Sequence, residues 1–308
     1  MEVKKINQKT IKDSLKSEDT EEVIDIYFYR PIGFFWAKIA MKLHITPNMI
    51  TIASIFIGIG AGLLFYPNNL QLNIIGMLLL VLANSFDSAD GQLARLTNNS
   101  TRLGRFLDGL AGDMWFIVIY ISITLRLTSN GLPNWIWLLA SLAGLSHIFH
   151  ASMADYYRNI HLFFIKGKSG SEHDTSENLK KDLKQLYFRK DFSKIIFLWL
   201  YCNYTTQQEA LSPKLQKFLH ILKGKYPDDI PNDLSNELRE KNKKYMKYTN
   251  ILQFNTRVLF LFFCLFINLP WLYFIFDLLV MNSILIYLIY KEEKFAQHFT
   301  QQLTNVIY

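Results

Sequence analysis

The feature that most constrains the fold of this sequence is a series of apolar segments, each about as long as a lipid bilayer is thick. Four such segments lie within residues 45–157, and two more cover about 253–269 and 271–290. A helix needs roughly 20 predominantly apolar residues to cross the hydrocarbon layer of a membrane. A chain with so many long apolar segments is too apolar for an ordinary soluble protein. The sequence therefore predicts an all-α integral membrane protein with six transmembrane helices.

The first predicted span begins with the letters ITPNMIT. Thr46 is a suitable N-cap, and Pro47 fits the first position of a helix because its missing N–H would be unpaired there anyway. Gly58, Gly60 and Gly62 follow, and glycines let helices approach each other closely inside a membrane. We therefore expect a helix from Pro47 that packs tightly against neighbouring spans.

The segment before this span is more polar. Residues 1–20 contain no apolar core, so no signal peptide is evident. Residues 21–44 mix aromatic side chains with Arg30 and two lysines, which gives a charge about every turn. This pattern is typical of an amphipathic helix that lies in the membrane interface, although an ordinary core helix remains the alternative. We expect an interfacial helix ahead of the first span.

Basic residues are distributed unevenly among the connections. The connections at 67–70, 127–133 and 268–271 contain no Lys or Arg, whereas the stretch 158–250 holds more than half of the 33 basic residues. Cytoplasmic loops carry the excess of Lys and Arg in membrane proteins. We therefore expect both termini and the 158–250 stretch on the cytoplasmic side. The net charge of +7 is explained by this topology, so we expect no nucleic-acid partner.

These patterns divide the chain into four parts. Residues 1–44 form a tail and the interfacial helix, 45–157 a membrane core of four spans, 158–250 a cytoplasmic helical insertion, and 251–308 the last two spans and a C-terminal tail. Within the insertion, the apolar letters KIIFLWLYCNY are too few to cross a bilayer, so we expect them to pack on protein or lie in the interface. The two cysteines have no metal-site neighbours, which makes a zinc site or a disulfide framework improbable.

Four aspartates lie at or inside the apolar segments, where ionised carboxylates are expensive: Asp87, Asp90, Asp108 and Asp113. Asp87 and Asp90 would lie about 60° apart on a helix, with Gly91 on the same broad face. Clustered carboxylates repel each other and take up protons unless a cation holds them ionised. All-oxygen ligands favour Mg²⁺ or Mn²⁺. The pattern predicts a metal cluster that handles phosphates, rather than simple salt bridges at a membrane boundary.

The same residues carry a resemblance to a known family. The chain reads Asp87, two residues, Asp90-Gly91, two residues, Ala-Arg95, eight residues, Gly104, three residues and Asp108. This spacing resembles the motif of the CDP-alcohol phosphotransferase (CDP-alcohol phosphatidyltransferase) family. The likeness covers about residues 45–157, where the TPNMIT start of the first span also fits. The resemblance makes this part the catalytic membrane core.

What the resemblance implies is a reaction and a site. A CDP-linked donor would pass its substituted phosphate to an acceptor hydroxyl and release CMP, with two Mg²⁺ or Mn²⁺ ions bridging the diphosphate. Arg95, and Arg102 or Arg105 beside it, could hold phosphate oxygens. Asp87, Asp90 and Asp108 would be metal ligands. The residues implied to bind the CDP-linked donor are Asn48, Thr51, Gly91, Arg95, Thr101 and Gly104.

The sequence departs from the family pattern at the fourth aspartate. The pattern expects an Asp at position 112, but this chain has Gly112 there and Asp113 next. On a regular helix Asp113 would point about 140° away from Asp108. A π-bulge adds one residue to a turn and would bring Asp113 back. We expect such a bulge, with Asp113 as the base and fourth metal ligand. Without the bulge, the protein would be a weak or inactive relative.

The sequence does not decide between two pairs of donor and acceptor. The donor is CDP-diacylglycerol with a soluble acceptor such as inositol or its phosphate, or a CDP-linked small alcohol with diacylglycerol or ceramide as acceptor. Arg158 and Arg257 are candidates for binding an acceptor phosphate, whereas His147 and His150 fit packing or hydrogen bonds between helices. The bilayer is an expected partner and a second copy of the chain a candidate one. A non-catalytic membrane protein and a metal transporter are the alternatives from other classes.

Overall fold

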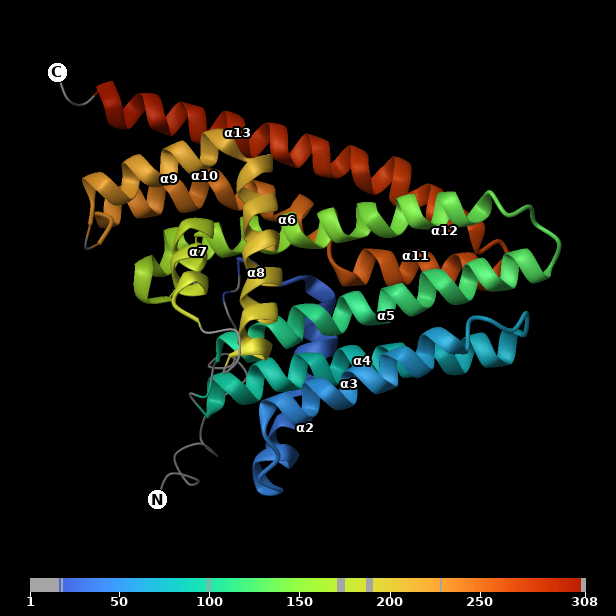
Figure 1. Cartoon of the computed structure of the whole chain (residues 1–308). Coiled ribbons are helices and arrows are strands. Elements are labelled where there is room, and N and C mark those ends of the chain that lie inside the picture. The colour runs from blue at the N-terminus through green and yellow to red at the C-terminus, as the bar shows by residue number, and fades with distance from the viewer. Residues whose placement is uncertain are drawn as a thin grey trace. The chain divides into compact units, whose positions relative to one another are not determined.

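The computed structural model describes residues 17, 19–97, 99, 101–170, 175–186, 191–227 and 229–305 of the 308-residue chain. Within its helices, it leaves out the side chains of residues 102, 103, 105, 106, 108, 168–170, 192, 193 and 305. The described residues are mainly helical, and no strand occurs among them (Figure 1). The predicted all-α class is confirmed.

The helices follow one another along the chain with short connections. In order they are η2 (Asp25–Tyr29), α2 (Arg30–Lys42), α3 (Pro47–Leu63), α4 (Leu70–Leu96), α5 (Arg102–Ser129), α6 (Ile136–Gly170), α7 (Ser176–Lys184), α8 (Phe192–Leu211), α9 (Pro213–Lys225), α10 (Asn232–Ile251), α11 (Phe254–Phe266), α12 (Trp271–Ile275), η3 (Phe276–Met281) and α13 (Asn282–Asn305).

Five helical stretches in the described chain are long and apolar enough to cross a membrane: Leu70–Leu96, Gly109–Ser129, Ile136–Gly167, Asn232–Phe266 and Trp271–Thr304. They correspond to the second through sixth predicted spans. The first predicted span is α3, which is apolar but shorter. These helices indicate an integral membrane protein. A total of six crossings, the cytoplasmic termini and the interfacial position of the N-terminal helix stay predictions.

The chain forms two compact units. One contains Met1–Ile148 and Phe254–Val280, and the other contains Phe149–Gln253 and Met281–Tyr308. In the first unit, α3 packs against both α4 and α5, as Figure 1 shows. A Cβ on Gly58 of α3 would come within 2.2 Å of the Trp115 ring of α5, and one on Gly62 would lie 3.0 Å from Val118. The expected close approach at these glycines is confirmed, whereas Gly60 faces open space.

Helix ends in the first unit follow the expected capping rules. α3 begins at Pro47 with Thr46 as its N-cap residue, as predicted. Asn69 caps α4 by accepting hydrogen bonds from two backbone N–H groups, those of Gln71 and Leu72. Thr101 caps α5 by accepting one from the N–H of Gly104 at 2.9 Å. The side-chain oxygens of Asn69 and Thr101 thus satisfy N–H groups that have no partner inside the helix, whereas the Thr46 side chain makes no capping hydrogen bond.

The end of α5 farthest from the aspartates carries a buried arginine. Arg126 is 2% exposed. Its guanidinium donates to the backbone carbonyl of Phe65, and to the side-chain oxygens of Asn68, Asn73 and Asn268 at 2.7, 3.3 and 2.6 Å. Neutral oxygens from three parts of the chain therefore surround this cation and hold two connections of the first unit to α5.

The second unit contains the insertion, which is helical as predicted. α6 extends beyond the expected end of the fourth span near residue 157, with a kink at Gly167, where φ is 65° and ψ is −160°, and α7 to α10 follow. α13 packs against α9 and α10. Glu293 of α13 accepts hydrogen bonds from the N–H groups of Lys214 and Leu215 at the start of α9, both at 3.0 Å. The apolar letters KIIFLWLYCNY lie within the 20-residue α8.

Candidate functional site

The C-terminal part of α4 carries the aspartate motif and packs against α3. Asp90 is buried, and its carboxylate accepts a hydrogen bond from the hydroxyl of Thr51 on α3. Ser54, one turn further along α3, donates to the carbonyl oxygen of Thr51 at 2.7 Å. Asp87 lies one turn before Asp90 and is only partly buried. The structure thus brings together Thr51 and Asp90, two of the residues that the sequence selected.

Arg95 folds back over the glycine of the motif. A Cβ placed on Gly91 would lie 3.4 Å from Nη1 and 3.6 Å from Nη2 of Arg95. The guanidinium therefore covers the surface of α4 where a glycine replaces a side chain. A planar guanidinium in this position can hold two phosphate oxygens at once. The predicted role of Gly91 and Arg95 in binding the CDP-linked donor stays a prediction.

A second group of predicted residues meets where α3 and α5 begin. A Cβ on Gly104 would lie 3.1 Å from Oγ1 of Thr101 and 3.3 Å from Oδ1 of Asn48. Asn48 is in the first turn of α3, and Thr101 is the N-cap residue of α5. Helix N-termini present free N–H groups and favour anions such as phosphate. The structure therefore places Asn48, Thr101 and Gly104 together, as one donor site requires.

The predicted bulge in the third span is wrong. α5 is α-helical from Arg102 to Ser129, so no extra residue is accommodated between Asp108 and Asp113. A regular helix turns Asp113 about 140° from Asp108 and leaves Gly112 in the row that the family pattern gives to an aspartate. Gly109 and Gly112 both face open space. The glycines ease a distortion but do not impose one, because an α-helix already pairs each of these backbone groups.

The four-carboxylate cluster stays a prediction. Among the side chains that the structure describes, no group of three or more His, Cys, Asp or Glu residues could hold a metal ion. The side chain of Asp108 lies outside the described residues, as do those of Arg102 and Arg105. The predicted role of Asp113 as the fourth metal ligand depended on the bulge, which α5 does not contain. Asp87 and Asp90 still supply the all-oxygen chemistry that Mg²⁺ and Mn²⁺ prefer.

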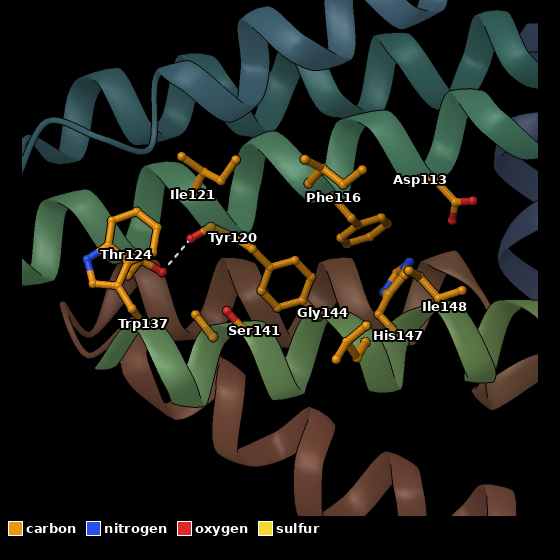
Figure 2. A pocket seen from close by; sticks show the side chains of 13 residues that line it. Asp113, Phe116, Tyr120, Ile121, Thr124, Trp137, Ser141, Gly144, His147 and Ile148 are labelled. Carbon is orange, nitrogen blue, oxygen red and sulfur yellow. Dashed lines mark hydrogen bonds between the residues drawn. The ribbon is translucent and has the colours of Figure 1, made fainter. Parts of the chain in front are cut away.

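Asp113 instead lines a pocket between α5 and α6. Figure 2 shows it at one end, with Phe116 beside it and His147 across from it. The pocket has a volume of about 370 Å³. Its other lining residues are Ile117, Tyr120, Ile121, Thr124, Trp137, Ala140, Ser141, Gly144, Leu145 and Ile148. His147 packs its ring against Phe116 with centroids 4.3 Å apart, which agrees with the predicted packing role.

A buried polar network adjoins this pocket. Arg257 of α11 forms an ion pair with Asp277 of η3 at 2.7 Å, and these side chains are 1% and 0% exposed. The Tyr120 hydroxyl donates to the other oxygen of Asp277. Arg257 also interacts electrostatically with Asp113. The sequence analysis missed Asp277, although a single acidic residue inside an apolar span is a signal that could have found it.

The two arginines proposed for an acceptor phosphate lie in different units. Arg257 belongs to the first unit and has Asp277 as its partner. Arg158 belongs to the second unit, where it donates to the side-chain oxygen of Gln253 at 3.1 Å and lies 3.7 Å from Asp155. A phosphate-binding role for either arginine stays a prediction. His150 binds the side-chain oxygen of Asn282 at 2.8 Å, as expected for a hydrogen bond between helices.

α2 packs directly on the motif, against the face of α4 that bears Ser88 and Gln92. Gln92 donates to the backbone carbonyl of Arg30 at 3.0 Å, and the Arg30 guanidinium donates to Ser88 at 3.3 Å. Arg30 also forms a two-oxygen pair with Glu21. A Cβ on Gly33 would lie 2.8 Å from the Ser88 hydroxyl. The N-terminal helix therefore fixes the motif from the side opposite its carboxylates.

The preceding segment η2 ties this helix to α11. Asn255 of α11 donates to Asp25 at 3.0 Å. Tyr29 packs edge-on against Phe254, and burial raises the pKa of its phenol above the ordinary value. The N-terminal segment thus contacts both the motif helix and α11 within the first unit.

Comparison with known proteins identifies this region. Residues 44–161 match the family model described as CDP-alcohol phosphatidyltransferase. The matched segment covers less than half of the chain, and it contains every predicted site residue except Arg257. It also contains both helices that form the pocket, up to the middle of α6.

Three curated proteins are similar to the chain over short segments. An uncharacterized protein of Aquifex aeolicus is 44% identical over 68 residues, which is 22% of this chain and 33% of that protein. The phosphatidylinositol phosphate synthase of Corynebacterium glutamicum is 36% identical over 72 residues, or 23% and 32%. The CDP-diacylglycerol–glycerol-3-phosphate 3-phosphatidyltransferase of Rickettsia typhi is 43% identical over 68 residues, or 22% and 38%. The chain spans about a third of the length of the curated relatives it matches.

Proposed function

We propose that the protein is a membrane transferase that moves a substituted phosphate from a CDP-linked donor to an acceptor hydroxyl and releases CMP. The observation that carries this proposal is the geometry around the motif within the matched domain. Arg95 covers Gly91, Thr51 binds Asp90, and Asn48 and Thr101 meet at Gly104. A guanidinium and two helix N-termini suit a nucleoside diphosphate.

A divalent metal site fits the donor set. Asp87 and Asp90 present carboxylate oxygens one turn apart, and Asp108 is proposed to complete the set from α5. When bound, Mg²⁺ or Mn²⁺ would neutralise the diphosphate and stabilise charge that develops on the leaving phosphate. Thr51 holds one oxygen of Asp90, so the carboxylate is oriented before a substrate binds. Such orientation by an outer partner is typical of metal ligands.

The roles of the remaining residues follow from their positions. Arg95 would hold phosphate oxygens, and the missing side chain of Gly91 leaves room for its guanidinium to lie against α4. The regular α5 turns Asp113 about 140° away from Asp108, so the proposed role of Asp113 as the base has lost the bulge on which it depended. A weakly active or inactive relative is therefore the alternative to a fully active transferase. The proposed place of the reaction is the cytoplasmic side of the membrane.

The relatives' names suggest phospholipid synthesis for this chain as well. One relative is named for phosphatidylinositol phosphate and another for transfer to glycerol 3-phosphate. Both names indicate a soluble, phosphate-bearing acceptor, so inositol phosphate is one finer proposal. A CDP-linked small alcohol with a lipid acceptor is the other.

The experiment is an assay of CMP release by the purified full-length protein in lipid nanodiscs. CDP-linked donors and acceptor alcohols are combined with Mg²⁺, Mn²⁺ or a chelator. Asp87→Asn and Asp90→Asn should each lower turnover by about a hundredfold or more, because transition-state charge loses its stabilisation. Asp233→Asn is the matched control, since it makes the same change at an exposed site in α10.

Two results would contradict the proposed function. One is CMP release that continues at the full rate with the chelator present. The other is release that falls equally in the Asp90→Asn and Asp233→Asn proteins. If no donor and acceptor pair yields CMP while the metal still binds, the non-catalytic alternative is favoured.

A further inference from the structure

We propose that α10 and α13 of the second unit form a binding site for the headgroup phosphate of an anionic phospholipid, built by Lys247, Lys291 and the tyrosines beside them. This site lies outside the matched segment 44–161, and the inference does not depend on the proposed reaction. The two helices belong to the same unit and pack against each other (Figure 1).

Two lysines from different helices lie over one pair of tyrosine rings. The rings of Tyr248 on α10 and Tyr287 on α13 meet edge-on, with centroids 5.0 Å apart. Nζ of Lys247 lies 4.8 Å from the Tyr248 centroid. Nζ of Lys291 lies 5.1 Å from the Tyr287 centroid and 5.9 Å from that of Tyr290. Both lysines also interact electrostatically with Tyr248, so two cations share one small aromatic surface.

The positive charge at this surface is not balanced by carboxylates of the described chain. Neither Lys247 nor Lys291 forms an ion pair there, whereas Lys241, earlier on α10, pairs with Glu237 at 2.7 Å. Two like charges held near each other repel, and an anion bound between them offsets that repulsion. Ammonium groups bind phosphate oxygens through charge-assisted hydrogen bonds. The surface therefore favours an anionic ligand such as a phosphate group.

The exposed face of α13 changes from apolar to basic at this surface. Ile286 is 68% exposed, Tyr290 one turn later is 59% exposed, and Lys291 follows. The helix is part of the apolar stretch Trp271–Thr304, which is long enough to cross a membrane. From Ile286 to Lys291 a helix rises about 8 Å, roughly the thickness of one headgroup layer. With Ile286 at the edge of the hydrocarbon, Lys291 therefore reaches the lipid phosphates.

α10 shows the same order of residues in the opposite chain direction. Its exposed Lys244 and Lys247 come before Tyr248, and the fifth predicted span begins near residue 253. Because α10 leads into a predicted span and α13 leads out of one, their basic and aromatic residues meet at one level. Tyrosines gather at membrane interfaces, and basic pockets between helices bind anionic headgroups. A phospholipid fits both features, with its phosphate at the lysines and an acyl chain along Ile286.

The test is native mass spectrometry of the detergent-purified full-length protein, titrated with phosphatidylglycerol or with phosphatidylcholine of the same acyl chains. Each lysine near an anionic lipid contributes about fivefold in affinity. Lys247→Gln combined with Lys291→Gln should therefore weaken phosphatidylglycerol binding by about thirtyfold and leave phosphatidylcholine binding unchanged. The control combines Lys184→Gln and Lys217→Gln, at exposed lysines of the same unit, and should keep the wild-type affinity. Arginine at both site positions should keep it as well.

A second measurement separates loss of the site from loss of the fold. In nanodiscs of phosphatidylcholine alone, the wild type and the double site variant should unfold at the same temperature, whereas added phosphatidylglycerol should stabilise only the wild type. If the double variant unfolds earlier in phosphatidylcholine, the single change Lys247→Gln decides, because that side chain is exposed. Binding weakened about fivefold would then support the site, and unchanged binding would overturn it.

Three results would overturn the inference. Equal losses in the site variant and in the control would show attraction by overall charge. Equal affinity for the two lipids would show that negative charge is not selected. Displacement of phosphatidylglycerol by inorganic phosphate or glycerol 3-phosphate at equal concentration would assign the lysines to a free phosphate. CMP release enters none of these comparisons, so the inference can fail while the proposed function holds, and the reverse.

Discussion

The buried pair of Arg257 and Asp277 yields the sharpest stability prediction. The change is Asp277→Asn, which keeps the shape of the side chain but removes its charge. The two side chains are 1% and 0% exposed and 2.7 Å apart, so neither can turn to water when its partner is lost. The variant would leave a buried guanidinium with neutral partners on that side, and Tyr120 would lose the charged acceptor of its hydroxyl.

The expected cost is large. Removing one partner of a buried ion pair destabilises proteins by about 3–5 kcal/mol, because the remaining charge stays desolvated. At about 2–4 °C per kcal/mol for a unit of this size, the midpoint of thermal unfolding should fall on the order of 10 °C. Replacing both partners together by Arg257→Met and Asp277→Leu should restore most of that loss, since an apolar pair leaves no uncompensated charge.

The measurement is thermal unfolding of the detergent-purified protein, followed by tryptophan fluorescence. The matched control is Glu177→Gln, which breaks the Lys181–Glu177 pair at the same 2.7 Å but with side chains 65% and 78% exposed. That change should shift the unfolding midpoint much less, because water solvates both charges of a surface pair when the pair is broken. Equal shifts for Asp277→Asn and Glu177→Gln, or a double variant no more stable than the single one, would refute the reasoning.

Three other predictions concern the first unit and the topology. Gly33→Val should lower turnover more than donor binding, because the valine side chain would push α2 away from Ser88 and loosen the motif. Separate measurements of kcat and of KM for the donor would show this difference. Arg126→Met should destabilise the protein by about 1–3 kcal/mol in the same unfolding assay, since several buried oxygens lose their donor. A membrane-impermeant thiol reagent added outside should label Leu70→Cys but not Asn203→Cys, and the reverse pattern would invert the predicted topology.

Much of the first unit could be predicted because local rules govern it. α3 begins at Pro47, as the preference of proline for the first helical position predicts. Gly58 packs closely against a neighbouring helix because it has no side chain. Asp90 was selected because its charge lies in an apolar segment and Thr51 because of the family resemblance, and the structure joins them in one hydrogen bond. These outcomes depend on the spacing of residues a few positions apart, which can be read directly from the sequence.

What could not be predicted depends on contacts between distant parts of the chain. The helix from Arg102 is regular because an α-helix already satisfies its backbone hydrogen bonds. Asp113 therefore faces α6, and no bulge turns it back toward Asp108. π-Helical segments lie instead at 25–29 and 276–281, and in the second of them Asp277 reaches both Arg257 and Tyr120. The extension of α6 to Gly170 likewise had no local stop signal near residue 157.

The oxygens around Arg126 also set an order of events during synthesis. Asn268 lies 142 residues after Arg126 in the chain, whereas Phe65 and Asn73 precede it. When the third apolar helix leaves the ribosome, its arginine can find only the earlier partners, and the shortest of its hydrogen bonds waits until the second-to-last apolar helix has been made. A nascent chain truncated before that point carries an incompletely solvated cation inside the lipid, which gives membrane quality control a means to distinguish it from the finished protein.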